Sequence, residues 1–337
     1  MNTIKKIILA SVASIFVATS AFSGALEVTG TMEITSTQKS AQETGNPLGM
    51  ENEWALSAST ELDNGVGVAY KQTVGQGMAA NDSQLMFTLV GLGKIGFDST
   101  GTPMDAVDDK TPSAFEEATH GTGTLNDIGT NDGTMGIRYT LADVMGSGIT
   151  IDTMFLPKAG SGDQTGDGAV SGDTGGKKGT AYEIVASGNP LAQAGIDGLT
   201  FTVGTAQIEN FTTGGAHDLT EYAAGINYAY GPVTIGYQRN HRDMGGVTTG
   251  GAETDTTNTH YSIAYAVNDS LSVSYGEAKS VERYAGDTSV EQEWDGISAG
   301  YSMGGMTVSF ITGEAKNADY TVGRKEEIKQ VNLAVAF

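Results

Sequence analysis

The chain has 337 residues, no cysteine, and 40 acidic against 18 basic side chains, which gives a formal net charge of -22 at pH 7. This charge disfavours nucleic acids and anionic membrane surfaces as partners. Without cysteine, disulfides and thiol chemistry are excluded. Glycine contributes 48 residues and proline only 6, a composition that indicates many turns and closely approached strands rather than proline-rich disorder.

The N-terminus has the pattern of an export signal. Lys5 and Lys6 precede an apolar run over residues 7–17, and small residues follow at positions 23–25. This order predicts a signal peptide over residues 1–25, cleaved before Leu26. The apolar run is too short to cross a bilayer as a helix, which needs about 20 residues; a retained anchor is the weaker alternative.

Along the predicted mature chain, sixteen segments alternate apolar residues with small or polar ones. A period of two is typical of a strand with one apolar and one polar face, and an even number of such strands is typical of a bacterial transmembrane barrel. We therefore predict an all-β, transmembrane antiparallel β-barrel that uses residues 26–337 as one domain. The clearest apolar positions are Leu85, Phe87, Leu89, Met135, Ile137, Tyr139, Leu199, Phe201, Val203, Tyr222, Ile226, Tyr228, Val233, Ile235, Tyr237, Tyr261, Ile263, Tyr265, Leu271, Val273, Tyr275, Ile297, Tyr301, Met306, Val308 and Phe310.

The connections alternate in predicted length. Short, glycine- or asparagine-containing turns are expected at residues 63–65, 91–93, 231–232, 268–269 and 304–305, and long polar loops at residues 157–179, 210–219, 243–256 and 282–291. Short turns on one rim and long loops on the other are typical of outer-membrane barrels.

One long loop, over residues 98–133, follows the fifth predicted strand and shows no periodicity. Because a sixteen-stranded barrel leaves a wide channel, a loop folded into the lumen is the natural way to narrow it, and an acidic constriction would favour cations. The alternative, a solvated outer loop, stays open. The loop contains a single lysine, Lys110, and the acids Asp98, Asp105, Asp108, Asp109, Glu116, Glu117, Asp127 and Asp132.

Strand parity predicts which bases face the loop across the pore. If Val68 and Tyr70 point to lipid, Lys71 points inward, and the same rule sends Lys94 and Arg138 into the lumen. We expect these three residues to form a basic wall opposite the acidic loop.

The C-terminus ends in an alternating strand whose last residue is Phe337. Chain ends usually fray into water, so a terminal aromatic residue indicates a strand end that faces lipid, in the interfacial girdle of a barrel. Trp54, Trp294 and most tyrosines are assigned to the same girdle.

The signal peptide, the sixteen segments, Phe337 and the long loop together resemble the sixteen-stranded general porins of Gram-negative bacteria. The resemblance covers Leu26 to Phe337 and implies a homotrimer in the outer membrane that passes small hydrophilic solutes by passive diffusion. It also implies that the loop at 98–133 is the third loop that narrows porin pores. Phe337 then belongs to the signal read by the barrel assembly machinery, and acidic outer loops would contact lipopolysaccharide through divalent ions. The arginine cluster common in that family is missing, since the five arginines are scattered.

Other motifs carry little weight. Residues 91–96 fit a dinucleotide-binding pattern but lead into no helix, and Ser298 has the spacing of a nucleophile elbow but lies mid-strand, where it is expected to be a lumen hydroxyl. The four histidines lack ligand spacing and are expected at the surface. We predict no enzyme activity, no cofactor and no metal site, with weak calcium binding in the loop of Asp163, Asp167 and Asp173 as the open alternative.

Three functions remain compatible with the sequence. The first is a general diffusion porin that prefers cations, and the second is a substrate-selective outer-membrane channel. The third is a secreted structural or adhesive β-protein without a pore, although a solenoid of that kind should show a fixed repeat, and none is found in the sequence.

Overall fold

A computed structural model describes residues 26–40, 45–78, 80–131, 133–159, 178–210, 217–246, 252–286 and 288–337. The predicted signal peptide and the loop of Asp163, Asp167 and Asp173 lie outside these residues, as does Asp132.

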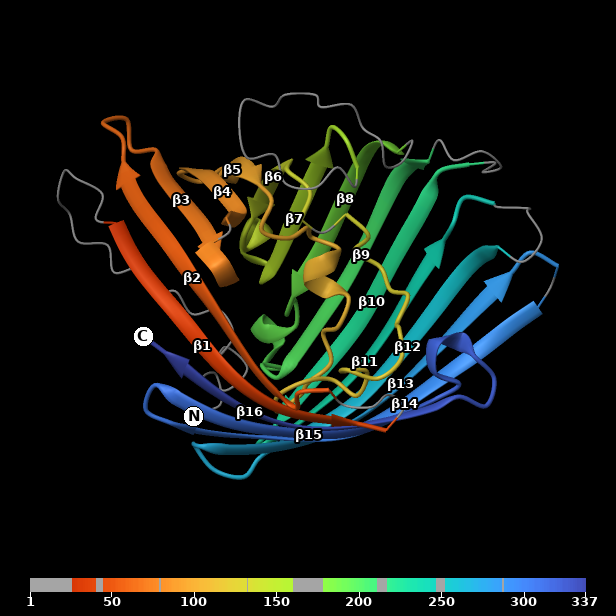
Figure 1. Ribbon diagram of the computed structural model, residues 1–337. Coiled ribbons are helices and arrows are strands. Elements are labelled where there is room, and N and C mark those ends of the chain that lie inside the picture. Colours follow the sequence, from red (N-terminus) through yellow and green to blue (C-terminus); the bar gives the residue numbers. More distant parts are fainter. Residues whose placement is uncertain are drawn as a thin grey trace.

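The prediction of a sixteen-stranded antiparallel barrel is confirmed (Figure 1). Each strand pairs with its neighbours in sequence, and β1 also pairs with β16, so the sheet closes without a free edge. The strands are β1 (Leu26–Lys39), β2 (Leu48–Glu61), β3 (Gly67–Val74), β4 (Ala80–Leu89), β5 (Gly93–Asp98), β6 (Gly136–Leu141), β7 (Ile149–Leu156), β8 (Lys178–Gly188), β9 (Leu199–Asn210), β10 (Leu219–Tyr230), β11 (Val233–Asp243), β12 (Glu253–Ala266), β13 (Leu271–Tyr284), β14 (Thr288–Met303), β15 (Met306–Lys316) and β16 (Lys325–Ala336).

The period-two pattern produces two different surfaces. On β14, Ile297 and Tyr301 are about half exposed on the outer face, whereas Ser298 between them is buried on the lumen side. The predicted girdle tyrosines follow the outer face, as Tyr228 and Tyr265 illustrate. In a membrane, the outer face meets lipid and the inner face meets water or lumen contents. Within the described residues, no helix is long and apolar enough to cross a bilayer.

The rims differ from the prediction in detail. The short turns lie where expected, for example between β10 and β11 and between β14 and β15. The long loops, however, are shorter than predicted, because the strands continue into polar sequence: Glu282 pairs with Val290 and Tyr284 with Thr288, inside the expected loop 282–291. Polar side chains indicate that a residue contacts water, but they do not show where backbone pairing ends. The length of these loops was therefore overestimated from the polarity of the sequence.

The chain end closes the barrel. The backbone N–H of Phe337 donates to the carbonyl of Gly30 (3.0 Å), and the N–H of Gly30 donates to the carbonyl of Phe337 (2.8 Å). The Phe337 ring then lies edge-on to Trp54, with ring centroids 5.2 Å apart. A Cβ atom at position 30 would approach the Trp54 and Phe337 rings to 2.9 and 3.0 Å, so glycine makes room for both. The seam between the first and last strands is therefore covered by an aromatic pair.

We predict that Phe337→Ala weakens this seam, because an edge-on aromatic pair contributes about 0.5–1.5 kcal/mol beyond its area. The matched control is Phe97→Ala, since Phe97 is similarly exposed on β5. Urea unfolding of the refolded barrels in lipid vesicles should show a lower midpoint for Phe337→Ala alone. Equal midpoints for the two variants would contradict the role of the seam.

Candidate pore constriction

The connection between β5 and β6, residues 99–135, is here called the inner loop. It leaves β5 after Asp98 and crosses the inside of the barrel, where Figure 1 shows it in orange to yellow alongside the strands β9 to β12. Its hydrogen bonds reach from β8 to β16. The prediction that this loop folds into the barrel is confirmed, with the difference that Asp98 is the last residue of β5 and not part of the loop.

A buried ion-pair network directs the loop inward. Arg138 on β6 donates through Nη1 to Asp98 (2.8 Å) and to the Gly101 carbonyl (3.3 Å), and through Nε to Asp152 on β7 (3.0 Å). Asp98 also accepts a hydrogen bond from Gln84 on β4 (2.7 Å). Because two carboxylates meet one guanidinium, the positive charge of Arg138 is compensated within the wall. The bond from Arg138 to the Gly101 carbonyl fixes the first loop residues close to the lumen face of β6.

The outgoing arm of the loop, residues 102–115, is held by its backbone. Its N–H groups donate to side chains that point into the lumen from strands β8, β11, β13 and β14. These bonds are Met104 to Glu183 (3.0 Å), Lys110 to Gln238 (2.7 Å), Ala114 to Ser274 (2.9 Å) and Phe115 to Ser298 (3.2 Å). Gln238 also donates to the carbonyls of Val107 and Asp108. The lumen hydroxyl predicted at Ser298 thus serves as an acceptor for the loop.

The return arm, residues 122–131, runs back along the same wall. It bonds to β16, β14, β12 and β10 in turn, and its polar contacts again include backbone groups. They are Gly123 N–H to Glu326 (2.9 Å), Trp294 Nε1 to the Thr122 carbonyl (2.7 Å), Asn258 to the Asn126 carbonyl (2.9 Å), and the N–H groups of Gly129 and Thr130 to Glu221 (3.0 and 3.3 Å).

Two buried carboxylates that the sequence analysis did not identify hold the loop, Glu183 on both arms and Glu221 on the return arm. Glu183 accepts from Met104 N–H and from the Asn131 side chain (3.1 Å). Glu221, which is fully buried, accepts from Gly129, from Thr130 N–H and from the Thr130 hydroxyl (2.7 Å). Hydrogen bonds to a carboxylate are about twice as strong as neutral ones. The only sequence signal was a glutamate at an inward position on a strand, and inward polar residues are common in barrels.

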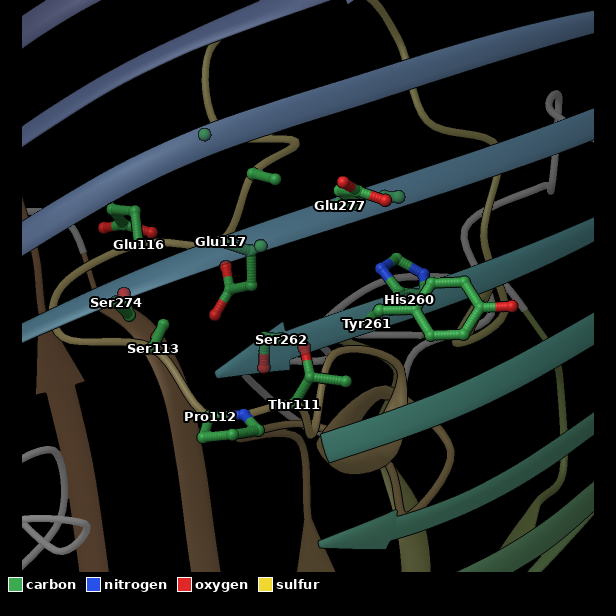
Figure 2. A pocket seen from close by; sticks show the side chains of 14 residues that line it. Thr111, Pro112, Ser113, Glu116, Glu117, His260, Tyr261, Ser262, Ser274 and Glu277 are labelled. Atoms are coloured by element: carbon green, nitrogen blue, oxygen red, sulfur yellow. The ribbon is translucent and has the colours of Figure 1, made fainter. Parts of the chain in front are cut away.

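Small residues let the loop approach the wall closely. A Cβ atom at Gly296 on β14 would lie 3.1 Å from the Ala118 Cα, and at Gly276 on β13 it would lie 3.5 Å from the Ala118 Cβ. Figure 2 shows the small cavity that the loop leaves against β12 and β13, with Glu117 and Ser262 among its lining residues.

Two aromatic residues differ from their predicted positions. Trp294, expected in the girdle, is buried on the lumen side of β14 beneath the inner loop. His260, expected at the surface, is buried on β12, with Nε2 3.6 Å from an Asp127 oxygen. In both cases the loop covers an inward side chain that would otherwise face water. Within the described ranges, no group of three or more His, Asp or Glu side chains could hold a metal ion.

The predicted basic wall lies on the lumen face. Lys71 pairs with Gln84, and Lys94 pairs with Thr140, whose hydroxyl bonds Asp152, so both lysines share the face of Arg138. Among the described residues, the side chain of neither lysine has a hydrogen-bond or ion-pair partner. Arg138, in contrast, is already compensated by two carboxylates.

Glutamates occupy the same face on the neighbouring strands. Glu33 on β1 pairs directly with Glu51 on β2, and Glu53 is two positions along from Glu51 on the same face. Glu33 receives a hydrogen bond from Asn332 (3.4 Å), which confirms its inward direction. The wall expected to be basic is therefore a wall of mixed charge, because parity places Glu33, Glu51 and Glu53 inward as well as the lysines.

The comparison with protein-family models assigns residues 7–325 to the Gram-negative porin model. The chain belongs to the Gram-negative porin family. It is accordingly an outer-membrane channel protein, and the alternative of a secreted β-protein without a pore is wrong. No curated protein sequence matches it significantly.

Solved porin-like structures share the fold of this porin at low sequence identity. The trimer form of OmpT, an outer membrane protein of Vibrio cholerae, has 12% identity and a TM-score of 0.69, with 94% of this chain and 100% of that chain covered. A mutant porin of Rh. blastica has 17% identity and a TM-score of 0.60 (93% and 100% covered). The anion-selective porin from Comamonas acidovorans has 12% identity and a TM-score of 0.62 (94% and 100% covered).

The predicted constriction acids of the porin differ in environment. Asp105 begins the short helix η3 (Asp105–Val107), and Asp108 follows it. Burial, together with the neighbouring carboxyls of Asp109, Asp127 and Asp105, raises the pKa of Asp108 to about 9. Asp109 is about half exposed, 3.5 Å from the exposed Lys110 ammonium. At neutral pH, Asp108 is therefore mostly protonated, whereas Asp109 lies at the loop surface beside Lys110.

The two glutamates lie in the middle of the inner loop and line the small cavity against β12 and β13. Glu116 lies 3.4 Å from His120, and this hydrogen bond raises the pKa of His120. Burial, with a further contribution from Asp109, raises the pKa of Glu117 to about 7. Glu117 is therefore the loop acid whose charge changes within the physiological pH range.

We predict that Glu221→Ala releases the return arm while the barrel persists, because two backbone N–H groups and one hydroxyl lose their acceptor, at a cost of about 1–3 kcal/mol per unsatisfied group. The control is Glu293→Ala on the outer face of β14. Limited proteolysis of the refolded proteins should cut the inner loop faster only in Glu221→Ala. Equal cleavage rates would show that Glu221 does not hold the loop.

Proposed function

We propose that this porin is a general diffusion channel for ions and small hydrophilic solutes that prefers cations. The observation that carries the proposal is the charge of the lumen left open beside the inner loop. Exposed carboxylates lie on both of its sides: Asp109 on the loop, and Glu51 and Glu53 on the wall of β2. An excess of carboxylates in a narrow channel concentrates cations and repels anions.

Passive diffusion rather than dedicated sugar transport is supported by the direction of the aromatic side chains. A sugar-binding channel would need aromatic faces along the lumen, whereas Tyr228, Tyr237, Tyr265 and Tyr301 lie on the outer face. A substrate-selective channel remains the second candidate. We expect neither enzyme activity nor a cofactor.

The proposed assembly is a homotrimer in the outer membrane, in contact with lipid and lipopolysaccharide and inserted by the barrel assembly machinery through the strand that ends at Phe337. The trimer form of the similar Vibrio cholerae OmpT supports the stoichiometry. Light scattering tests this stoichiometry, because it gives the mass of the detergent-solubilised protein after correction for the bound detergent. A value of one subunit at concentrations where the pore conducts would contradict a trimer.

We predict that replacing Asp105, Asp108 and Asp109 together by Asn reduces the cation preference, because charge at the loop surface is lost. The reversal potential in a salt gradient at pH 7 measures this. Asp108→Asn alone is the matched control: with a pKa of about 9, Asp108 carries little charge at pH 7, so this variant should match the wild type. An unchanged reversal potential in the triple variant would remove these acids from the ion path.

We predict that the cation preference rises with pH between about 6 and 8. Glu117, whose pKa is raised to about 7, is neutral below this range and negative above it, so the loop gains negative charge as the pH increases. Reversal potentials at pH 6 and pH 8 should differ in the wild type and differ less in Glu117→Gln. If both proteins show the same change, Glu117 does not titrate at the pore.

A further inference from the structure

The connection between β15 and β16, residues 317–324, folds onto the inner loop, and we call it the strap. It contains the short helix η6 (Ala318–Tyr320). Asn317, Asp319 and Tyr320 all have positive φ values, between 51° and 53°. This left-handed conformation is uncommon for residues other than glycine, so the strap is held in it by its surroundings.

The strap has its own internal supports. Asn317 accepts from the Gly323 N–H (2.8 Å), and the N–H of Ala318 donates to the Arg324 carbonyl (3.0 Å). Arg324 also forms an ion pair with Asp319 (2.7 Å). The strap is therefore a folded unit that presents Asp319 and Tyr320 in fixed directions.

Both of these side chains bind the return arm of the inner loop. The Thr124 hydroxyl donates to Asp319 (2.8 Å), and the Asn126 N–H donates to the Tyr320 hydroxyl oxygen (3.3 Å). The Tyr320 hydroxyl also shares a hydrogen bond with Ser280 on β13 (2.7 Å). The hydroxyl oxygen of Tyr320 thus connects the strap to both the inner loop and the barrel wall.

Packing adds to these polar contacts. Ala318 is fully buried in a cluster with Ala118, Ala278, Trp294 and Ala315. At Gly123, a Cβ atom would lie 3.5 Å from the Ala318 Cα and 2.3 Å from the Gln292 side chain. The start of the return arm is therefore enclosed between the wall on one side and the strap on the other.

We propose that the strap fixes the inner loop in its open-channel position, with Tyr320 as the positioning residue; this inference rests on the proposed function as a channel. The other contacts of the loop are with the wall, from β8 to β16. A loop that is bound on two sides has fewer ways to move into the lumen. The strap therefore suppresses spontaneous closure of the pore.

The first test removes one hydroxyl. Tyr320→Phe removes the hydroxyl that accepts from the Asn126 N–H and bonds Ser280, and it keeps the ring. Tyr301→Phe is the control because Tyr301 lies on the outer face. Since a net hydrogen bond corresponds to roughly 3- to 10-fold in an equilibrium, closures in single-channel records should become roughly 3- to 10-fold more frequent in Tyr320→Phe only. Thermal unfolding of the barrel should be the same in both. Equal closure frequencies in the two variants would overturn the proposal.

The second test locks the strap. The protein has no cysteine, so Thr124→Cys combined with Asp319→Cys introduces a single pair where the native oxygens are 2.8 Å apart. Oxidation should cross-link the pair, seen as a mobility shift that each single variant lacks. Closures should then fall below the wild-type frequency and return on reduction. Failure to cross-link, or closures that do not respond to the cross-link, would contradict the strap.

The outcomes separate this inference from the proposed function. A wild type without conductance, or one that prefers anions, overturns the proposed function, and the cross-linking result still tests the contact between strap and loop. If the wild type prefers cations but both sets of variants close as often as the wild type, only the proposal for the strap is overturned.

Discussion

The fold of the pore depends on the hydrogen-bond acceptors that the backbone N–H groups of the inner loop require. The loop places peptide groups in the barrel interior, where buried N–H groups without acceptors are costly. Glu183, Glu221, Gln238, Ser274 and Ser298 supply acceptors from the lumen side of the wall. Because these side chains lie on β8, β10, β11, β13 and β14, the loop lies against that part of the wall.

The position of the loop against these strands determines which residues line the remaining channel. The polar side chains beneath the loop are used for holding it and are largely buried. On the wall, Glu51 and Glu53 are exposed and Glu33 is half-buried. These three glutamates outnumber Lys71 and Lys94, the bases of this face that no carboxylate compensates, since Arg138 is compensated by Asp98 and Asp152. Selectivity in this porin is thus expected to follow from net negative charge and not from opposed acidic and basic walls.

Much of the fold could be predicted from the sequence, because a barrel strand must alternate between lipid and lumen. The same rule gave the inward direction of Lys71, Lys94 and Arg138. It could not tell whether an inward polar residue meets water or protein. Glu221 and Trp294 both lie on the lumen face beneath the loop. The alternation is consistent with this inward direction, but nothing in the local pattern shows that the loop covers them.

The contacts of the strap and of the seam could not be predicted from local sequence patterns for a related reason. Tyr320 contacts Asn126 across 194 positions of sequence, and Gly30 in the first strand bonds Phe337 after the last strand. A terminal aromatic residue predicted a strand end, but not the glycine that accommodates its ring. Such pairs are determined by barrel closure, which brings the first and last strands together.

The most direct test of the account is the reversal potential of the purified wild-type protein in a planar bilayer with a tenfold potassium chloride gradient at pH 7. We expect stable conductance steps and a potential whose sign shows that potassium crosses more readily than chloride. A potential near zero, or one of the opposite sign, would contradict the claim that uncompensated carboxylates control the open channel.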